Sequence, residues 1–259
     1  MDPLIPASFP GQRGLEVCAN GYESALNAQI GGAIRVELCD NLAEGGTTPS
    51  YAKIALAKKN LAIEIWPIIR PRGGDFLYSD LEFELMKEDV KNCKSLNCDG
   101  IVIGILEADG RIDNKRCAEL IALAKPLPVA FHRAFDMCND MEQALEDLIG
   151  LGVIRVLSSG GAANASEGAE RLAQLVNQAT GRISIMPGAG INETNISSLI
   201  IATQAKEFHA SAKTFVNSKM AFRNNSSKMG TIEDEYQYEI TAVDKVKKLV
   251  EQLNKIKLP

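Results

Sequence analysis

One pattern recurs along this sequence and limits what it can fold into. A short run of apolar and β-branched residues is followed by a polar, glycine-rich turn and then by a helical stretch. The apolar runs are residues 15–18, 34–39, 63–69, 100–105, 129–133, 153–158, 183–186 and 207–210. Strands that alternate with helices require a parallel sheet. Eight such units in 259 residues predict an α/β protein with a single (β/α)8 TIM barrel. An open doubly wound sheet is the alternative.

Capping residues locate several of the helices. Ser79, Asp140 and Asn164 each stand three residues before a Glu or Gln, which is the spacing of a helix N-cap. Pro49 is predicted to lie in the first turn of a helix, where its missing N–H costs nothing. Apolar residues at helical spacing predict a C-terminal helix over residues 241–255.

The remaining segments fit one domain with a short arm. Residues 1–14 contain three prolines and predict a flexible N-terminal arm, and residues 15–259 form the barrel domain. Residues 214–238 are polar and rich in Asn and Ser, so they predict a long loop after the eighth strand. Loops of that length are often functional lids or disordered, and the sequence leaves both open.

The bulk composition excludes several classes of partner. The net charge of −5 offers no basic face for nucleic acid. No apolar run approaches the roughly 20 residues that cross a bilayer, and the N-terminus has no apolar signal region. The six cysteines contain no Cys-x-x-Cys pair, so we expect reduced thiols in a cytoplasmic or nuclear protein.

Ionisable side chains gather where the predicted strands end, which is the active face of such barrels. Alternation places Glu16 beside Cys18 on one strand face and Glu37 beside Cys39 on the next. A charged group inside a barrel needs an oppositely charged partner or a role in binding or catalysis. Either the two glutamates pair with Arg70, Arg72 or Arg133, or a carboxylate and a histidine form an acid–base pair. The candidate catalytic residues are Glu16, Glu37, Arg70, His132, Arg133, Asp136 and His209.

Two glycine-rich turns predict an anion site: residues 159–161 after the sixth predicted strand, and residues 188–190 after the seventh. Their backbone N–H groups can converge on an anion near the starts of the following helices. The glycines can equally serve only the tight turns. The candidate anion-binding residues are Arg72, Ser159, Gly160, Gly161, Gly188, Gly190 and Ser211. Lys213 is the one lysine near a strand end, so a Schiff-base mechanism is disfavoured.

Cys18 and Cys39 end neighbouring strands, which lie about 4.8 Å apart in a sheet. Two thiols at that distance can share a soft metal ion such as Cu(I). The alternative is that both are small residues at the edge of the core.

Several long motifs together resemble the CutC family of copper homeostasis proteins, in its eukaryotic-type form. They are LEVC (15–18), RVELC (35–39), LAEGGTTPS (42–50), IRPRGGDF (69–76), FHRAFD (131–136), MPG (186–188) and EFHAS (207–211). The resemblance implies a (β/α)8 barrel, copper tolerance, a cytosolic or nuclear location and a homo-oligomer, a dimer or tetramer. It also implies Cu(I) ligation by Cys18 and Cys39. Ala189 stands where the family usually has glycine, which predicts a turn less open to an anion.

Two functional hypotheses therefore stand side by side. The first is a copper homeostasis protein that binds Cu(I) through its strand-end cysteines. The second is a TIM-barrel enzyme, an isomerase, lyase or hydrolase, acting on an anionic small molecule such as a phosphorylated one. It is motivated by Arg70, Arg72 and Arg133, because hard anions and Cu(I) want different ligands. A scaffold with a relict site is a third, blander possibility.

Overall fold

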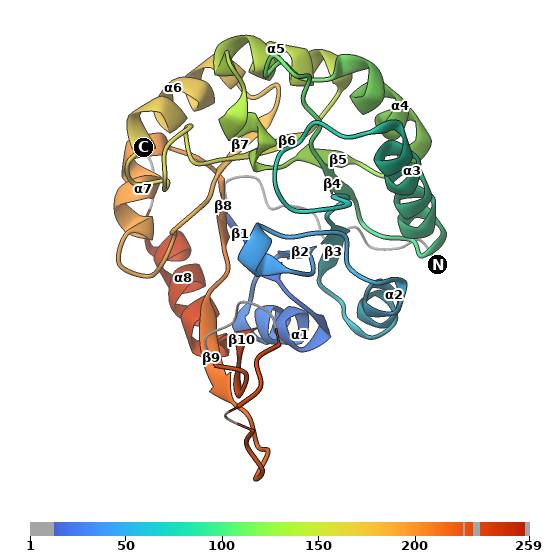
Figure 1. Cartoon of the computed structure of the whole chain (residues 1–259). Helices are drawn as coiled ribbons and strands as arrows, with labels where there is room; N and C mark the ends of the chain where they lie inside the picture. Colours follow the sequence, from blue (N-terminus) through green and yellow to red (C-terminus); the bar gives the residue numbers. More distant parts are fainter. Residues whose placement is uncertain (1–12, 225, 230–233, 257–259) are drawn as a thin grey trace, which may run out of the picture.

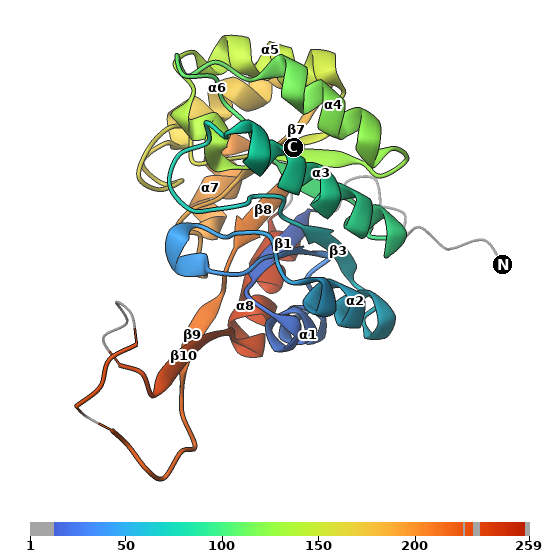
Figure 2. The same ribbon diagram turned by 45° about the vertical axis from the view of Figure 1, so that its right-hand side comes forward.

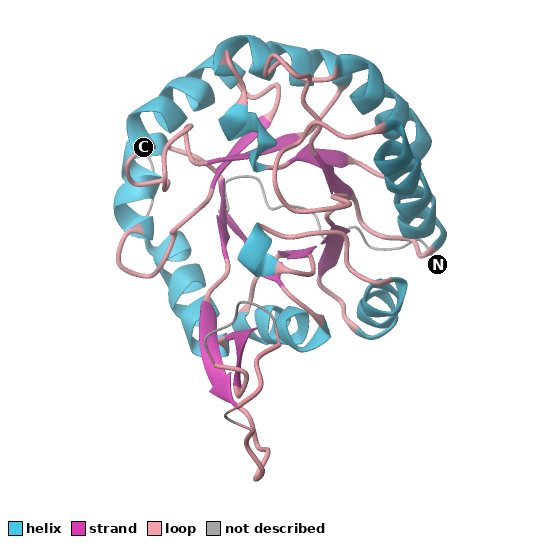
Figure 3. Cartoon of the chain, in the orientation of Figure 1, coloured by secondary structure: helices cyan, strands magenta, loops and turns pink. Residues whose placement is uncertain are grey.

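The computed structural model describes residues 13–224, 226–229 and 234–256, and the predicted arm lies almost wholly outside these ranges. A ring of helices surrounds a central set of parallel strands (Figures 1 and 3). The barrel strands are β1 (Gly14–Ala19), β2 (Arg35–Leu38), β3 (Glu64–Pro67), β4 (Ile101–Ile103), β5 (Val129–Phe131), β6 (Arg155–Ser158), β7 (Ser184–Pro187) and β8 (Glu207–Ala210). The helices are α1 (Tyr22–Gly31), α2 (Tyr51–Asn60), α3 (Asp80–Ser95), α4 (Asn114–Ala124), α5 (Met141–Leu151), α6 (Ala169–Ala179), α7 (Ile196–Thr203) and α8 (Val243–Lys255).

The strands form two parallel arcs that meet to close a barrel. One arc has the order β3-β2-β1-β8 and the other β4-β5-β6-β7. A parallel bridge between Ile68 and Val102 joins β3 to β4, and β7 runs beside β8. The predicted (β/α)8 barrel is therefore confirmed, and all eight predicted apolar runs contain a strand.

Strand alternation divides the buried residues into two layers. One set, including Leu15, Val17 and Val36, packs outward against the helices. The opposite set lies inside the barrel, where Trp66, Ile68, Val102 and Ala130 form a small apolar cluster beside Cys39. The helix-facing layer is much the larger, and burial of apolar surface at about 25 cal/mol per Å² makes it the main source of stability.

The helix caps follow the predictions in part. Ser79 forms a capping box with Glu82 at the start of α3, and Asp140 caps α5. Pro49 is not in the first turn, because Ser50 accepts from the Lys53 N–H and α2 begins after it.

The predicted start of α6 at Asn164 is wrong. The Asn164 side chain accepts from the Glu167 N–H, but this bond closes a turn, and α6 begins at Ala169. The cause is a close backbone approach at Gly168, where a Cβ atom would lie 1.8 Å from the Ser159 carbonyl oxygen. This contact keeps residues 160–168 outside the helix.

After β8 the chain leaves the barrel as a projecting ribbon. Strand β9 (Lys213–Asn217) pairs antiparallel with β10 (Gln237–Thr241), so the stretch predicted as one long loop begins and ends in β-structure. Figure 2 shows the ribbon and its tip extending away from the helices. The chain then returns as α8, whose Val246 packs so closely on Gly31 of α1 that only glycine fits there. No helix of the described residues is long and apolar enough to cross a bilayer.

Candidate functional site

A cavity of about 620 Å³ opens at the carboxyl ends of the strands. Its wall includes Cys18, Glu37, Arg70, His132 and His209, which come from five different strand ends. Pockets that bind small molecules typically measure about 300 to 1,000 Å³. The cavity is therefore large enough for an organic ligand as well as for a metal ion.

The two strand-end cysteines meet at one edge of this cavity. The Sγ atoms of Cys18 and Cys39 lie 3.3 Å apart. Glu37 pairs in register with Cys18 and shares a strand face with Cys39. As a result, the two sulfurs and one Glu37 oxygen all lie within 4.8 Å of one another. Alternation had placed Glu37 beside Cys39, but it was not recognised as a third donor.

The surroundings of the thiols favour their protonated form in the protein without metal. The hydrogen bond to Cys39 and burial raise the pKa of Cys18 well above its ordinary value. For Cys39, the bond from Cys18 lowers the pKa, but burial and the nearby Glu37 carboxylate outweigh it and raise the pKa overall. A metal ion that binds the two sulfur atoms as thiolates must therefore displace the protons of both thiols.

His209 connects the thiol pair to a buried glutamate. Its Nδ1 atom lies 2.8 Å from Glu16 Oε1, and its Nε2 atom lies 3.7 Å from Glu37 Oε2. Burial lowers the pKa of His209, but its bonds to Cys18 and Glu16 raise it well above the usual value. Burial likewise raises the pKa of Glu16, and Arg35 and His209 reverse this to leave it strongly lowered. The pair is thus an imidazolium and a carboxylate.

Below this pair, the barrel interior holds a network that sequence reasoning missed. Arg35 donates through Nε to Glu16 and through Nη2 to Glu207 at 2.9 Å. Arg155 makes a two-bond contact with Glu207, at 2.6 and 3.0 Å, and both guanidinium groups lie over the ring of Trp66. The same period-two alternation could have found these residues, because each stands two positions before an inward-facing one. Glu16 therefore pairs with Arg35 and His209. Of the two alternatives for the glutamates, pairing with Arg70, Arg72 or Arg133 is wrong for Glu16, and a carboxylate–histidine pair is present.

The two arginines at the end of β3 lie in different surroundings. Arg70 is buried, and its guanidinium donates to the carbonyls of Glu44, Gly46 and Gly74. Arg72 lies outside the cavity wall and pairs with Asp75 and Glu82. The structure thus brings only the first of the two to the mouth.

His132 begins the 3-10 turn η2 (Arg133–Met137) on the opposite side of the mouth from the cysteines. Its Nδ1 atom accepts from the Ala134 N–H at 3.1 Å, which assigns the proton to Nε2. Burial, together with the charge of Arg70, lowers the pKa of His132 to about 3. His132 is therefore a neutral imidazole, whereas His209 is charged.

The glycine turn after β6 already holds a carboxylate of the protein itself. Asp136 accepts from the N–H groups of Ser159 and Gly161 and from the hydroxyls of Ser158 and Ser159. Arg133 completes the cluster by pairing with Asp136 at 2.7 Å. The Gly160 N–H donates to the Ser158 hydroxyl instead. The convergence of donors predicted for this turn is present, and Asp136 is their acceptor.

The turn after β7 has a different geometry. The Gly188 N–H donates to the Ser158 carbonyl, and a Cβ atom at Gly188 would lie 2.4 Å from Leu157. Ala189 adopts a left-handed conformation with φ of 72°, which is uncommon for a residue with a side chain. Gly190 and Ser211 line the cavity. Anion binding at this turn stays a prediction.

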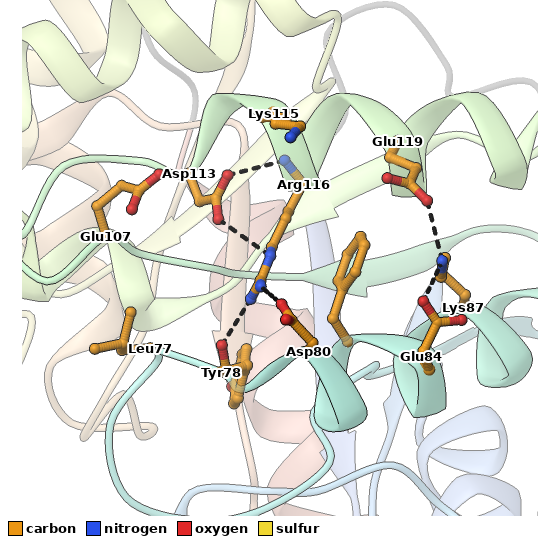
Figure 4. Close-up of a pocket in the computed structure, with 11 residues that line it drawn as sticks. Leu77, Tyr78, Asp80, Glu84, Lys87, Glu107, Asp113, Lys115, Arg116 and Glu119 are labelled. Carbon is orange, nitrogen blue, oxygen red and sulfur yellow. Dashed lines mark hydrogen bonds and ion pairs between the residues drawn. The ribbon is translucent and has the colours of Figure 1, made fainter.

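A second pocket, of about 430 Å³, lies on the outer surface between α3 and α4. Figure 4 shows that most of its charged side chains pair with one another, and that Glu107 and Lys115 do not. Arg116 pairs with Asp80 and Asp113, and Lys87 pairs with Glu84 and Glu119. The paired side chains balance each other's charges without a ligand. The pocket contains no residue of the barrel mouth.

The fold and the mouth define a class: a (β/α)8 barrel with a pair of thiols, one buried and one partly exposed, at the carboxyl ends of β1 and β2. The chain belongs to the CutC family of copper homeostasis proteins, whose sequence profile matches residues 14–214. A family protein CutC of Chromobacterium violaceum is 53% identical over 242 residues, covering 93% of this chain and 98% of the relative. The copper homeostasis protein cutC homolog of Mus musculus is 49% identical, covering 91% and 87%.

Solved structures agree with this assignment. A CutC crystal structure from Streptococcus agalactiae is 36% identical, with a TM-score of 0.74, and covers 77% of this chain and 98% of that one. Phosphoribosylanthranilate isomerase from Thermotoga maritima is 11% identical with a TM-score of 0.57, covering 94% and 100%. At that identity the likeness concerns the barrel fold alone.

Proposed function

We propose that this protein binds Cu(I) through Cys18 and Cys39 as part of copper homeostasis. The observation that carries the proposal is the 3.3 Å separation of the two sulfur atoms at the rim of the cavity. Thiolates are soft ligands and select Cu(I) over hard cations. Glu37 would lie beside the bound ion as a candidate third ligand, and the charged His209 would offset the net negative charge of a Cu(I) ion held by two thiolates.

A Cu(I) competition titration against a chelator under reducing, oxygen-free conditions tests this proposal. The variants are Cys18→Ser, Cys39→Ser and the double variant. Loss of both thiolates should weaken binding at least about tenfold, which is about 1.4 kcal/mol. Cys138→Ser is the matched control, because Cys138 is partly buried but lies outside the cavity wall. Unchanged tight binding in the double variant would count decisively against the proposal.

A second candidate function is an enzyme, an isomerase, lyase or hydrolase, acting on an anionic small molecule. The specific observation in its favour is the Glu16–His209 pair at the floor of a cavity far larger than a metal ion. In this proposal His209 and Glu16 move protons, and Arg70, His132 and Arg133 hold the substrate. A screen of phosphorylated small molecules tests it: turnover should disappear in His209→Asn and persist in the cysteine double variant.

We also propose that the protein works as a homo-oligomer, a dimer or tetramer, in the cytoplasm or nucleus. The support is the projecting ribbon, on which Phe215, Met220, Phe222 and Met229 are exposed. Apolar side chains gathered on one projection often mark a contact between proteins. Light scattering of the purified chain gives the oligomeric state directly, and imaging of the tagged protein gives its location.

A further inference from the structure

The buried charge of Arg70 is not balanced by any carboxylate of the described residues. Its three hydrogen bonds go to neutral backbone carbonyls, at 2.7, 2.7 and 2.9 Å. Glu44 contributes only its carbonyl oxygen to these bonds. The neighbouring Arg72 and Arg133, by contrast, each pair with an acid. A buried charge without a counter-charge is costly unless something else pairs with it.

Arg70 also has donors to spare. A guanidinium carries five N–H groups, and three of those of Arg70 are bonded to carbonyls. The Nε atom is buried and has no hydrogen-bond partner among the described residues. A guanidinium edge with free donors matches the geometry of a carboxylate or phosphate oxygen pair.

His132 supplies another unused donor beside Arg70. Both side chains contact Phe76: the guanidinium lies 5.1 Å from the ring centroid, and the imidazole centroid lies 5.1 Å from it. The Nε2 atom of His132 is buried without a hydrogen-bond partner in the described part of the chain. Because Nδ1 is an acceptor here, Nε2 carries the proton and can only donate. Burial and Arg70 keep this imidazole neutral and in that form.

We propose that the barrel mouth binds a small molecule through an oxyanion group, with Arg70 and His132 as the donors, beside the cysteine pair. The ligand class is a carboxylate or a phosphate, because Arg70 carries a full positive charge and because Arg70 Nε and His132 Nε2 are donors without an acceptor among the described residues. The carboxylates in the cavity wall belong to Glu37, Glu44 and Asp136. Arg133 lies partly exposed on the same wall, but its charge is already paired with Asp136. The cavity extends from these donors to Cys18, so the rest of the ligand has room to reach the thiols.

This oxyanion site is separate from copper binding, since it uses none of the cysteine ligands. As a binding site it stands on its own. As the substrate site of an enzyme, it deepens the second proposed function and rests on it. The two can therefore fail independently, and the experiment must distinguish them.

The test uses metal-free full-length protein titrated with inorganic phosphate and, in a parallel series, with acetate, at constant ionic strength. The chain has only two histidines, so labelling with ¹⁵N-histidine gives separate imidazole signals for His132 and His209. We expect a saturable shift of the His132 signal and a rise in the unfolding temperature. Phosphate binding more tightly than acetate identifies a phosphorylated ligand, and the reverse order identifies a carboxylate.

Variants assign the effect to the two donors. Arg70→Gln should weaken oxyanion binding at least about tenfold, since a charge-assisted hydrogen bond contributes about 1.5 to 3 kcal/mol. Arg72→Gln is the matched control and should bind as the wild type does. Because Arg70 also anchors three carbonyls, Arg70→Gln could fail to fold, so His132→Asn provides a second route. Asparagine can still accept from the Ala134 N–H but lacks the Nε2 donor, and it should weaken binding several-fold.

The opposite results are equally clear. If neither anion shifts the His132 signal, or if His132→Asn and Arg70→Gln both bind like the wild type, the oxyanion site does not exist. The Cys18→Ser, Cys39→Ser double variant should keep phosphate binding. If it does so while Cu(I) binding is absent even in the wild type, the copper proposal fails and the oxyanion proposal stands.

Discussion

Arg155 holds Glu207 with two hydrogen bonds, from Nε at 2.6 Å and from Nη2 at 3.0 Å, inside the barrel. Arg35 donates to the same carboxylate from the neighbouring side. Two-bond contacts between a guanidinium and a carboxylate are the strongest ion pairs in proteins, and breaking a buried one leaves an uncompensated charge.

This arrangement predicts an acid-labile contribution to stability. Burial raises the pKa of Glu207, but the two arginines outweigh it and lower the pKa to about 2. A lowered pKa means that the contribution is complete above about pH 4.5 and is lost as the pH falls towards 2. With 17% of the side chain exposed, it amounts to at most about 3 kcal/mol. Urea unfolding across this pH range should show a larger loss in the wild type than in Glu207→Gln, which keeps only the acid-labile contributions of other carboxylates such as Glu16. Parallel profiles for the two proteins would contradict the prediction.

Cu(I) binding should strengthen as the pH rises. The pKa values of Cys18 and Cys39 are both raised, so the metal-free protein carries protons that binding must release. The apparent affinity should increase by up to about tenfold per pH unit for each proton released. Competition titrations from about pH 6 to about pH 8 measure this slope. A flat profile would mean that the bound ion is not held by these thiolates.

Removal of the Asp136 carboxylate should create an anion site. Asp136→Ala leaves the N–H groups of Ser159 and Gly161 and the Ser158 hydroxyl without their acceptor, whereas the Ser159 hydroxyl keeps the Ala162 carbonyl. We expect a loss of about 3 kcal/mol in the free energy of unfolding, because several buried donors become unpaired. Added formate or phosphate should restore much of it. Asp109→Ala, at an exposed acid, is the control and should not respond to either anion.

Gly168 and Gly150 should respond oppositely to the same substitution. A Cβ atom at Gly168 would overlap the backbone carbonyl of Ser159, which cannot move aside as a side chain can. Gly168→Ala should therefore lower the free energy of unfolding by about 3 kcal/mol. At Gly150, inside α5, nothing lies within 4 Å of a Cβ atom. Gly150→Ala should raise it by about 0.5 to 1 kcal/mol. Thermal or urea unfolding of the two variants checks the contrast, and a mild Gly168→Ala effect would show that the loop can shift.

The fold could be predicted because its signal is local and repeated. Each barrel strand is an apolar run between turns, and eight repeats leave few alternatives. Period-two alternation likewise predicts that Glu16 and Cys18 share one inward strand face and that Glu37 and Cys39 share the next. Of the two alternatives for the glutamates, the pair with a histidine is present and the pair with a strand-end arginine failed. Glu16 pairs with Arg35 rather than with a strand-end arginine, because pairing inside a barrel depends on register between strands.

The start of α6 failed for a related reason. The Asn164 signal is real, since its side chain does accept from Glu167. The contact that delays the helix joins Gly168 to Ser159 through space, and no local pattern reveals it. The filling of the β6 turn by Asp136 was hidden in the same way. Serine and glycine N–H groups look identical in sequence whether their acceptor is a ligand or the protein itself.

The network beneath the mouth has one more consequence. Glu16, Glu64 and Glu207 carry three negative charges, and Arg35, Arg155 and the His209 imidazolium carry three positive ones. Their sum is zero, so the barrel floor projects little net field into the space above it. Discrimination between a soft cation and an oxyanion is therefore left to the rim, where sulfur atoms face one side and nitrogen donors the other. The two proposed ligands, Cu(I) and an oxyanion, would therefore be selected by different residues at the rim of the same cavity.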